Sequence, residues 1–322
     1  LAYERLLTRA LGITHRGYTR CLQRVLTDFG SDQSFAQAST KVQEHYGFEI
    51  NVGAVRKATL ECAREVAVQL DQESQADYRA LPAGPGPTII AEADGSMICT
   101  IQPGPRRAPR PRDYEEIRLA AAQAQGSVQT TYAASFESVD DWGRRWGQCA
   151  QVAGRSLESP IHGLGDGAEW ITRQMAEIFG SQGSYLCDFY HVKDYLRAAA
   201  PSCRAPAPDQ WRRTQQRRLK QGAVEKVFRE LKPRCEGADR ADQDAPVRVA
   251  HRYRDNRRGQ LDYAGALARD LPIGSGMIES GNKHVLQARL KLPGCAWLKP
   301  NAAVMAQLRV FRSNLRWNQL WN

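Results

Sequence analysis

Three acidic side chains occupy positions where the sequence predicts an exposed turn or the start of a helix. Asp94 precedes a glycine, Asp166 lies between two glycines, and Glu279 follows a Gly-Ser-Gly stretch at the start of a predicted helix. Singly, an Asp-Gly pair is usually only a turn, and a Glu in a first helical turn often only complements the helix dipole. Together, three carboxylates suit two Mg²⁺ ions, which prefer hard oxygen ligands and drive phosphodiester cleavage. Without metal the cluster would repel itself, and one carboxyl would tend to keep its proton.

These acids need a scaffold, and the chain after residue 80 predicts an α/β sheet. A Pro/Gly-rich linker at 81–87 precedes the apolar segment 88–101, which we interpret as a strand, a tight Asp94-Gly95 hairpin turn and a second strand. Asp94 and Asp166 are therefore expected at strand ends. Further strands are predicted at 114–122, 128–134, 159–167 and 184–190, and helices at 139–152, 168–179 and from 191 onward.

The first 80 residues are expected to form a separate helical region that binds DNA. A helical pattern over 34–46 ends at Gly47, and Asn51 is a good N-cap for the next helix. Helix, short turn and helix is the helix-turn-helix pattern, and the second of these helices carries Arg56 and Lys57 as candidate DNA contacts. The alternative is a helical hairpin used for packing or dimerisation.

The rest of the chain is expected to be helical. The stretch after residue 200 is polar, basic and without strand signals, and the C-terminal part is again helical at 278–290 and 300–317. We therefore expect a helical DNA-binding region at 1–80, the first part of the sheet-containing core at 81–200, a helical insertion at 201–270 and the C-terminal helices of the core at 271–322.

The charge of the chain favours a polyanionic partner. The net charge of the 322 residues is +10 and the pI is about 9.3. No acidic residue follows Glu279, whereas Lys283, Arg289 and Lys291 do, so we expect these three to contact DNA phosphates; a solvated helix face is the alternative. Trp297 is a candidate for stacking on a base, with core packing as the alternative.

Other classes of protein are disfavoured. No run of about 18 apolar residues predicts a membrane span, and the N-terminus does not have the pattern of a signal peptide. The eight cysteines include no CxxC pair, so no zinc ribbon or finger is predicted. Scattered cysteines in a chain of this length suit a reducing cytoplasm.

Several motifs that occur in order carry a family resemblance. They are Ala93-Asp94-Gly95, Gly165-Asp166-Gly167-Ala168-Glu169-Trp170-Ile171, Asp188-Phe189-Tyr190-His191 and Leu271-Pro272-Ile273-Gly274-Ser275-Gly276-Met277-Ile278-Glu279-Ser280, followed by Arg289-Leu290-Lys291 and Gly294-Cys295-Ala296-Trp297. Over roughly residues 85–318 they resemble bacterial insertion-sequence DDE transposases, close to the Kra group.

The resemblance implies an RNase H-like core, in which a mixed sheet is flanked by helices and a helical insertion precedes the last catalytic residue. Asp94, Asp166 and Glu279 match the first Asp, the second Asp and the Glu of the family. Asp188 and His191 match an Asp-x-x-His signature of related transposases that lies near the active site. His191 is therefore expected to position a phosphate or donate a proton, and capping of the following helix is the alternative.

On this interpretation the chain nicks DNA at insertion-sequence ends and then joins the freed 3′-hydroxyl to target DNA. Asp94, Asp166 and Glu279 would hold two Mg²⁺ ions, for which Mn²⁺ can substitute. The partners would be double-stranded DNA and further copies of the chain, in a homodimer or higher oligomer, without a membrane. The expected location is the bacterial cytoplasm, on the nucleoid. The alternatives are another RNase H-like nuclease, such as a resolvase or RNase, and a domesticated, catalytically silent DNA-binding protein.

Overall fold

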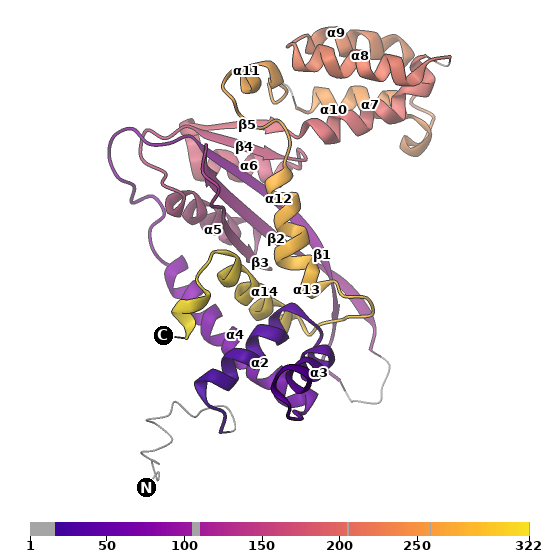
Figure 1. Ribbon diagram of the computed structural model, residues 1–322. Helices are drawn as coiled ribbons and strands as arrows, with labels where there is room; N and C mark the ends of the chain where they lie inside the picture. The colour runs from indigo at the N-terminus through magenta and orange to yellow at the C-terminus, as the bar shows by residue number, and fades with distance from the viewer. Residues whose placement is uncertain (1–16, 105–109, 205, 258, 322) are drawn as a thin grey trace.

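A five-stranded mixed sheet forms the centre of the molecule (Figure 1). The computed structural model describes residues 17–104, 110–204, 206–257 and 259–321. The strands are β1 (Ile89–Ile101), β2 (Arg112–Ala124), β3 (Thr131–Ser135), β4 (Ile161–Gly165) and β5 (Gly183–Cys187), in the spatial order β3-β2-β1-β4-β5. β2 is antiparallel to β1 and β3, whereas β4 runs parallel to both β1 and β5. This arrangement is consistent with an RNase H-like fold and confirms the predicted fold class.

β1 corrects the hairpin predicted at Asp94-Gly95. The strand continues through both residues, with Asp94 opposite Leu119 and Gly95 opposite Arg118 on β2. Gly95 does not adopt the left-handed backbone that a tight Asp-Gly hairpin turn requires. Instead, a Cβ atom at Gly95 would lie 2.2 Å from the Glu116 carboxylate, so glycine allows that side chain to lie across β1 in its present position. Asp94 therefore stands in the middle of the central strand, not at its end.

The two faces of β1 are covered by different helices, because successive side chains of a strand point to opposite sides. The odd-numbered side chains Ile89, Ala91 and Ala93 pack against α5 (Val139–Val152) and α6 (Glu169–Phe179). The even-numbered side chains Glu92, Asp94 and Ser96 contact two of the C-terminal elements, α12 (Gly276–Gly281) and a π-helix (Asn282–Gln287). The other C-terminal elements are α13 (Ala288–Leu290) and α14 (Lys299–Ser313).

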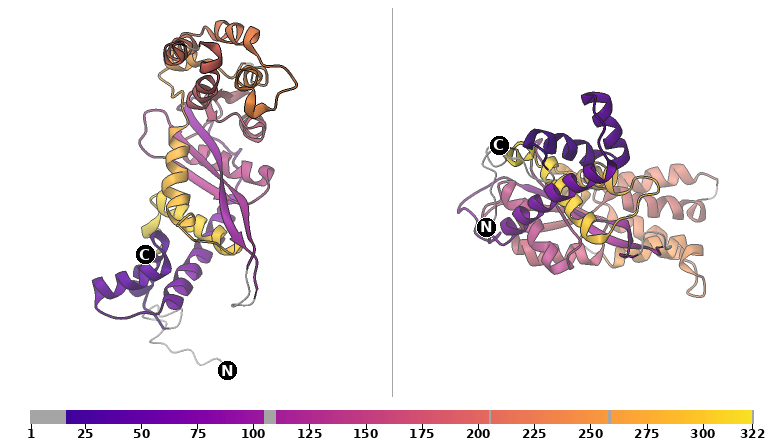
Figure 2. Two further views of the ribbon diagram at one scale, coloured as in Figure 1. Left: turned by 90° about the vertical axis from the view of Figure 1, so that its right-hand side faces the viewer. Right: turned by 90° about the horizontal axis from the view of Figure 1, so that it is seen from below.

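The N-terminal region is a group of three packed helices at one end of the sheet (Figures 1 and 2). They are α2 (Arg20–Asp32), α3 (Phe35–Tyr46) and α4 (Val52–Ser74). The predicted end of α3 and the predicted start of α4 are confirmed. Gly47 ends α3 in the left-handed conformation, and the Asn51 side chain accepts a hydrogen bond from the Gly53 N–H. α4 also packs on α14, which joins this region to the sheet.

A helical layer caps the opposite end of the molecule, as Figure 1 shows. It consists of α7 (Phe189–Cys203), α8 (Pro208–Lys220), α9 (Val224–Leu231), α10 (Pro246–Asp255) and α11 (Tyr263–Ala268). The described residues between 201 and 270 contain helices and no strand, as predicted. α7, which follows β5, packs against α8 and α10, so the insertion shares one apolar core with the end of the sheet.

Short 3-10 helices complete the chain at Gly180–Gln182, Lys232–Arg234, Asp242–Asp244 and Trp317–Leu320. In the part of the chain that the structure describes, no helix combines the length and the apolar character needed to cross a membrane.

Candidate active site

Asp94 lies on the even-numbered face of β1, under α12. One carboxylate oxygen accepts a hydrogen bond from the Gly95 N–H at 2.8 Å, and the other accepts one from the Asn282 side-chain amide at 2.6 Å. Burial raises the pKa of Asp94 to about 6; the Gly95 hydrogen bond opposes the shift, and the charges of Asp166 and Glu279 add to it. The same carboxyl also interacts with the charge of His191. These four groups are therefore electrostatic neighbours.

Glu279 is held over β1 by contacts on both sides of it. One residue before it, the Ile278 N–H donates to Glu92 at 2.7 Å, and three residues after it Asn282 donates to Asp94. Glu92 and Asp94 are two positions apart on one face of β1, a separation of about 6.6–6.8 Å. Ile278 and Asn282 are four positions apart, about 6 Å along an α-helix. The matched spacing lays α12 along β1 and directs Glu279 into the site.

Glu92 is a buried carboxyl beneath this helix. Its side chain is 1% exposed and accepts the amide of the first turn of α12. Burial raises the pKa of Glu92 to about 8; the Ile278 hydrogen bond opposes this, and the charges of Asp188 and Glu279 add to it. The carboxyl is therefore mostly neutral at pH 7 and acts as a fixed anchor for α12.

Asp166 reaches the same place through the parallel pairing of β4 with β1. The register pairs Ile89 with Ile161 and ends with Glu92 opposite Leu164. Two further steps place Asp166 beside Asp94, at the carboxyl end of β4. Asp166 is half-buried, and its own carboxylate accepts the Ala168 N–H at 2.8 Å. The prediction that Asp166 follows the end of a strand is confirmed.

Asp188 lies between β5 and α7 and joins two segments of the site. One carboxylate oxygen caps α7 by accepting the N–H groups of Tyr190 and His191. The other accepts both the N–H and the hydroxyl of Ser275, in the loop before α12. The side chain is fully buried. Asp188 thus fixes the start of α7, which carries His191, relative to the loop that carries Glu279.

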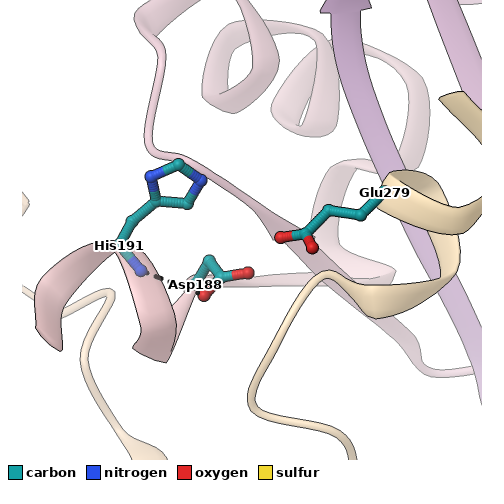
Figure 3. Close-up of side chains that lie close together, drawn as sticks. All are labelled: Asp188, His191 and Glu279. Atoms are coloured by element: carbon teal, nitrogen blue, oxygen red, sulfur yellow. Dashed lines mark hydrogen bonds between the residues drawn. The ribbon is translucent and has the colours of Figure 1, made fainter. Parts of the chain in front are cut away.

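Asp188, His191 and Glu279 converge from these elements, as the close-up in Figure 3 shows. Each offers one ligand atom, and these atoms all lie within 4.8 Å of one another, so the three could hold a metal ion. His191 and Glu279 are exposed. Asp188, however, already accepts four hydrogen bonds, which use the lone pairs that a metal would need. We therefore interpret Asp188 as the residue that positions the cluster and not as its main ligand.

The site is rich in carboxyl groups. Five carboxyl groups, those of Glu92, Asp94, Asp166, Asp188 and Glu279, are linked by the hydrogen bonds and charge interactions given above. A cationic side chain that acts on Asp94 is the exposed His191. Hard, mutually repelling oxygen donors of this kind fit a divalent cation such as Mg²⁺.

The predicted DNA-contact residues fall into two groups. Four are exposed: Arg56 and Lys57 line a groove where α4 meets the start of α14, and Lys283 and Lys291 lie on the π-helix and just after α13. Lys57 also forms an ion pair with Glu61 at 3.5 Å. These four side chains remain available to a phosphate backbone.

Arg289 and Trp297 require a correction, because both are buried, at 2% and 5% exposure. The Arg289 guanidinium donates to the Gly30 carbonyl and packs against the rings of Phe35 and Trp297, 4.6 and 4.8 Å from their centroids. Trp297 also bonds through its backbone to Cys99 and Ile101 at the end of β1. The two side chains join α2, α3 and β1, so packing explains them better than contact with DNA.

Two residues of the site were not predicted from the sequence. Glu92 and Asn282 have no distinctive motif around them. Their roles are revealed only by the hydrogen bond that Glu92 accepts from α12 and by the one that Asn282, on the π-helix, donates to Asp94. The signal that was available is the two-residue spacing between Glu92 and Asp94, which places both on one face of a continuous strand. The expected turn at Asp94-Gly95 obscured that signal.

Comparison with known families gives one match. Residues 2–318 match the family described as Uncharacterised protein family (UPF0236). No curated protein matches the chain.

Proposed function

Within the uncharacterised protein family UPF0236, to which the chain belongs, we propose that this protein is a DDE-type DNA transposase. It would nick double-stranded DNA at the ends of an insertion sequence and join the freed 3′-hydroxyl to target DNA. The proposal rests on the carboxylates of Asp94, Asp166 and Glu279.

One observation supports the proposal: rigid elements bring three carboxylates that are far apart in the sequence near enough for their charges to interact. Asp94 lies on the central strand, Asp166 follows the adjacent parallel strand, and Glu279 lies on a helix held to the central strand on both sides. The raised pKa of Asp94, to which burial contributes most and the charges of the other two contribute further, supports their proximity. Sites built on strands and helices hold their geometry better than sites on loops.

The donor set fits two Mg²⁺ ions. Asp94 interacts with the charges of both other carboxylates, and Asp94, Asp166 and Glu279 would together hold the ions. Bound in this way, the ions would neutralise the phosphate and favour attack by water or by a 3′-hydroxyl. Asn282 and the Gly95 N–H fix the orientation of the Asp94 carboxylate, so that little ordering remains to be done on binding.

Other side chains would serve the DNA. His191, exposed beside Glu279, is placed to contact a phosphate or to move a proton. The exposed Lys283 and Lys291 follow Glu279 along the chain and would bind the backbone of an element end near the site. Arg56 and Lys57 would bind DNA further away, and two copies of the chain would pair the two ends.

The test is a strand-cleavage and strand-transfer assay with oligonucleotides that carry the ends of the element. We expect the purified protein to cleave and join in Mg²⁺ or Mn²⁺ and to lose both activities in a chelator. Asp94→Asn, Asp166→Asn and Glu279→Gln should each reduce cleavage by roughly 100-fold or more, since even residues behind the metal ligands contribute about 10- to 100-fold. Glu158→Gln, at an exposed position before β4, is the matched control and should retain activity.

Different failures have different meanings. Cleavage without joining would identify a nuclease of the RNase H-like class in place of a transposase. DNA binding without cleavage in any divalent metal, or full activity of the Glu279→Gln variant, would contradict the assignment of the three carboxylates.

A further inference from the structure

The turn that carries Asp166 is bonded along its backbone. Its Gly165 carbonyl accepts the Asp188 N–H, and the Gly167 N–H donates to the Tyr185 hydroxyl at 3.1 Å. Two carbonyls remain, those of Asp166 and Gly167, and both accept donors from the helical insertion. Because Gly167 has a left-handed backbone, with φ of +83°, the chain reverses sharply here, and each bond constrains the position of the Asp166 side chain.

Tyr253, on α10, provides the first of these donors. Its hydroxyl donates to the Asp166 carbonyl at 2.8 Å. The side chain is 6% exposed, and its ring packs on Tyr195 of α7 with 4.3 Å between ring centroids. Burial strongly raises the pKa of Tyr253, so the phenol stays protonated and remains a donor.

Arg257, just beyond α10, provides the second donor. One guanidinium nitrogen donates to the Gly167 carbonyl at 2.7 Å, and another donates to the Tyr253 carbonyl at 3.3 Å. The guanidinium also lies over the Tyr253 ring, 3.8 Å from its centroid. A Cβ atom at Gly167 would lie 2.1 Å from the Arg257 Nε, so the close approach of Arg257 requires glycine.

We infer that the helical insertion sets the position of Asp166 through Tyr253 and Arg257, which act as positioning residues for the metal site. Both bond the backbone of the turn and not the carboxylate of Asp166, whose charge acts on Asp94. An ionic bond to that carboxylate would compete with a metal, whereas backbone bonds do not. The core is thus incomplete without the insertion, although the insertion lies outside the sheet. The role of these residues at a metal site rests on the proposed function. The hydrogen bonds by which the insertion holds the turn, which we call the clamp, do not depend on that function.

The chain offers a matched pair of variants for the test. Tyr253→Phe removes only the hydroxyl that bonds the turn. Tyr263→Phe makes the same change at a fully buried tyrosine whose hydroxyl has no hydrogen-bond partner among the described residues. Both are measured in the full-length, metal-free protein by amide hydrogen exchange of the segment 165–171, and then by Mn²⁺ titration followed by electron paramagnetic resonance.

Tyr253→Phe should speed exchange in this segment and weaken Mn²⁺ binding by roughly 2- to 10-fold, the factor that one net hydrogen bond represents. Tyr263→Phe should change neither by more than about twofold. Unchanged exchange in Tyr253→Phe, or equal effects of the two variants, would overturn the clamp. If Asp166→Asn binds Mn²⁺ as the wild type does, the metal role of Asp166 fails, and the exchange result still decides the clamp by itself.

Discussion

The Glu92→Gln variant tests whether the buried carboxyl under α12 is neutral in the folded protein. The structure raises the pKa of Glu92 from 4.5 to about 8, mainly by burial, so folding favours its neutral form. The contribution of this carboxyl to stability is therefore complete below pH 4.5 and is lost as the pH rises through about 8. Glutamine has nearly the same size, keeps an oxygen that can accept the Ile278 N–H, and does not ionise. The free energy of unfolding of the variant should therefore not show this loss as the pH rises.

The magnitude follows from the interval between the two pKa values, since one pKa unit corresponds to about 1.4 kcal/mol. Between pH 5 and pH 8.5 the free energy of unfolding of the wild type should fall by roughly 4 kcal/mol relative to Glu92→Gln. Asp94 titrates in part of the same window, but it does so in both proteins and cancels in the difference. Urea unfolding in a chelator, at several pH values, measures the effect without bound metal.

The control is Glu158→Gln, the same chemical change at an exposed position. Its stability relative to the wild type should not follow the pH dependence of Glu92→Gln. A difference between Glu92→Gln and the wild type that stays constant from pH 5 to 8.5 would refute the reasoning. It would mean that Glu92 is ionised in the folded protein, as a metal ligand or ion-pair partner would be.

Two further predictions concern the orientation of Asp94 and the binding of DNA. Asn282→Leu removes the amide that orients Asp94, so strand cleavage should fall by roughly 10- to 100-fold, with a higher Mg²⁺ requirement; an unchanged Mg²⁺ titration would contradict this role. Arg56→Ala should lower the slope of log affinity against log salt for duplex DNA by about 0.9, measured by fluorescence anisotropy. Arg144→Ala, exposed on α5 across the sheet, should leave that slope unchanged if Arg56 contacts a phosphate.

The sequence predicted the order of strands and helices because apolar periodicity is a local property. Helix α5 begins and ends where its pattern does, and α4 starts at its predicted cap, Asn51. The error at Asp94-Gly95 has a physical cause. A glycine after an aspartate permits a turn but does not require one, and here β2 pairs along the whole of β1. Strand pairing of this kind joins distant residues, so it could not be deduced from the local pattern.

The difference between local patterns and long-range packing also explains why a predicted DNA contact, Arg289, is buried. The charge of a segment can be counted from its sequence, but the burial of each charged side chain cannot be read from the sequence. Arg289 belongs to a basic C-terminal segment, yet its guanidinium packs against two aromatic rings, where burial lowers its pKa to about 10. Its neighbour Lys291, two residues later, is exposed. A stretch of cations therefore predicts a basic surface but does not say which of its members form that surface.

The two most deeply buried acids, Glu92 and Asp188, explain how the other acidic groups of the site are held together. Glu92 accepts the amide at the start of α12, and Asp188 accepts those at the start of α7, so each inner carboxyl fixes the first turn of one helix. Those helices carry Glu279 and His191. The hydrogen bonds that these two carboxyls accept fix the helices that carry the outer groups, and so hold the outer groups close together despite their mutual repulsion. Under the proposed function, the outer carboxylates of Asp94, Asp166 and Glu279 would then hold the metals.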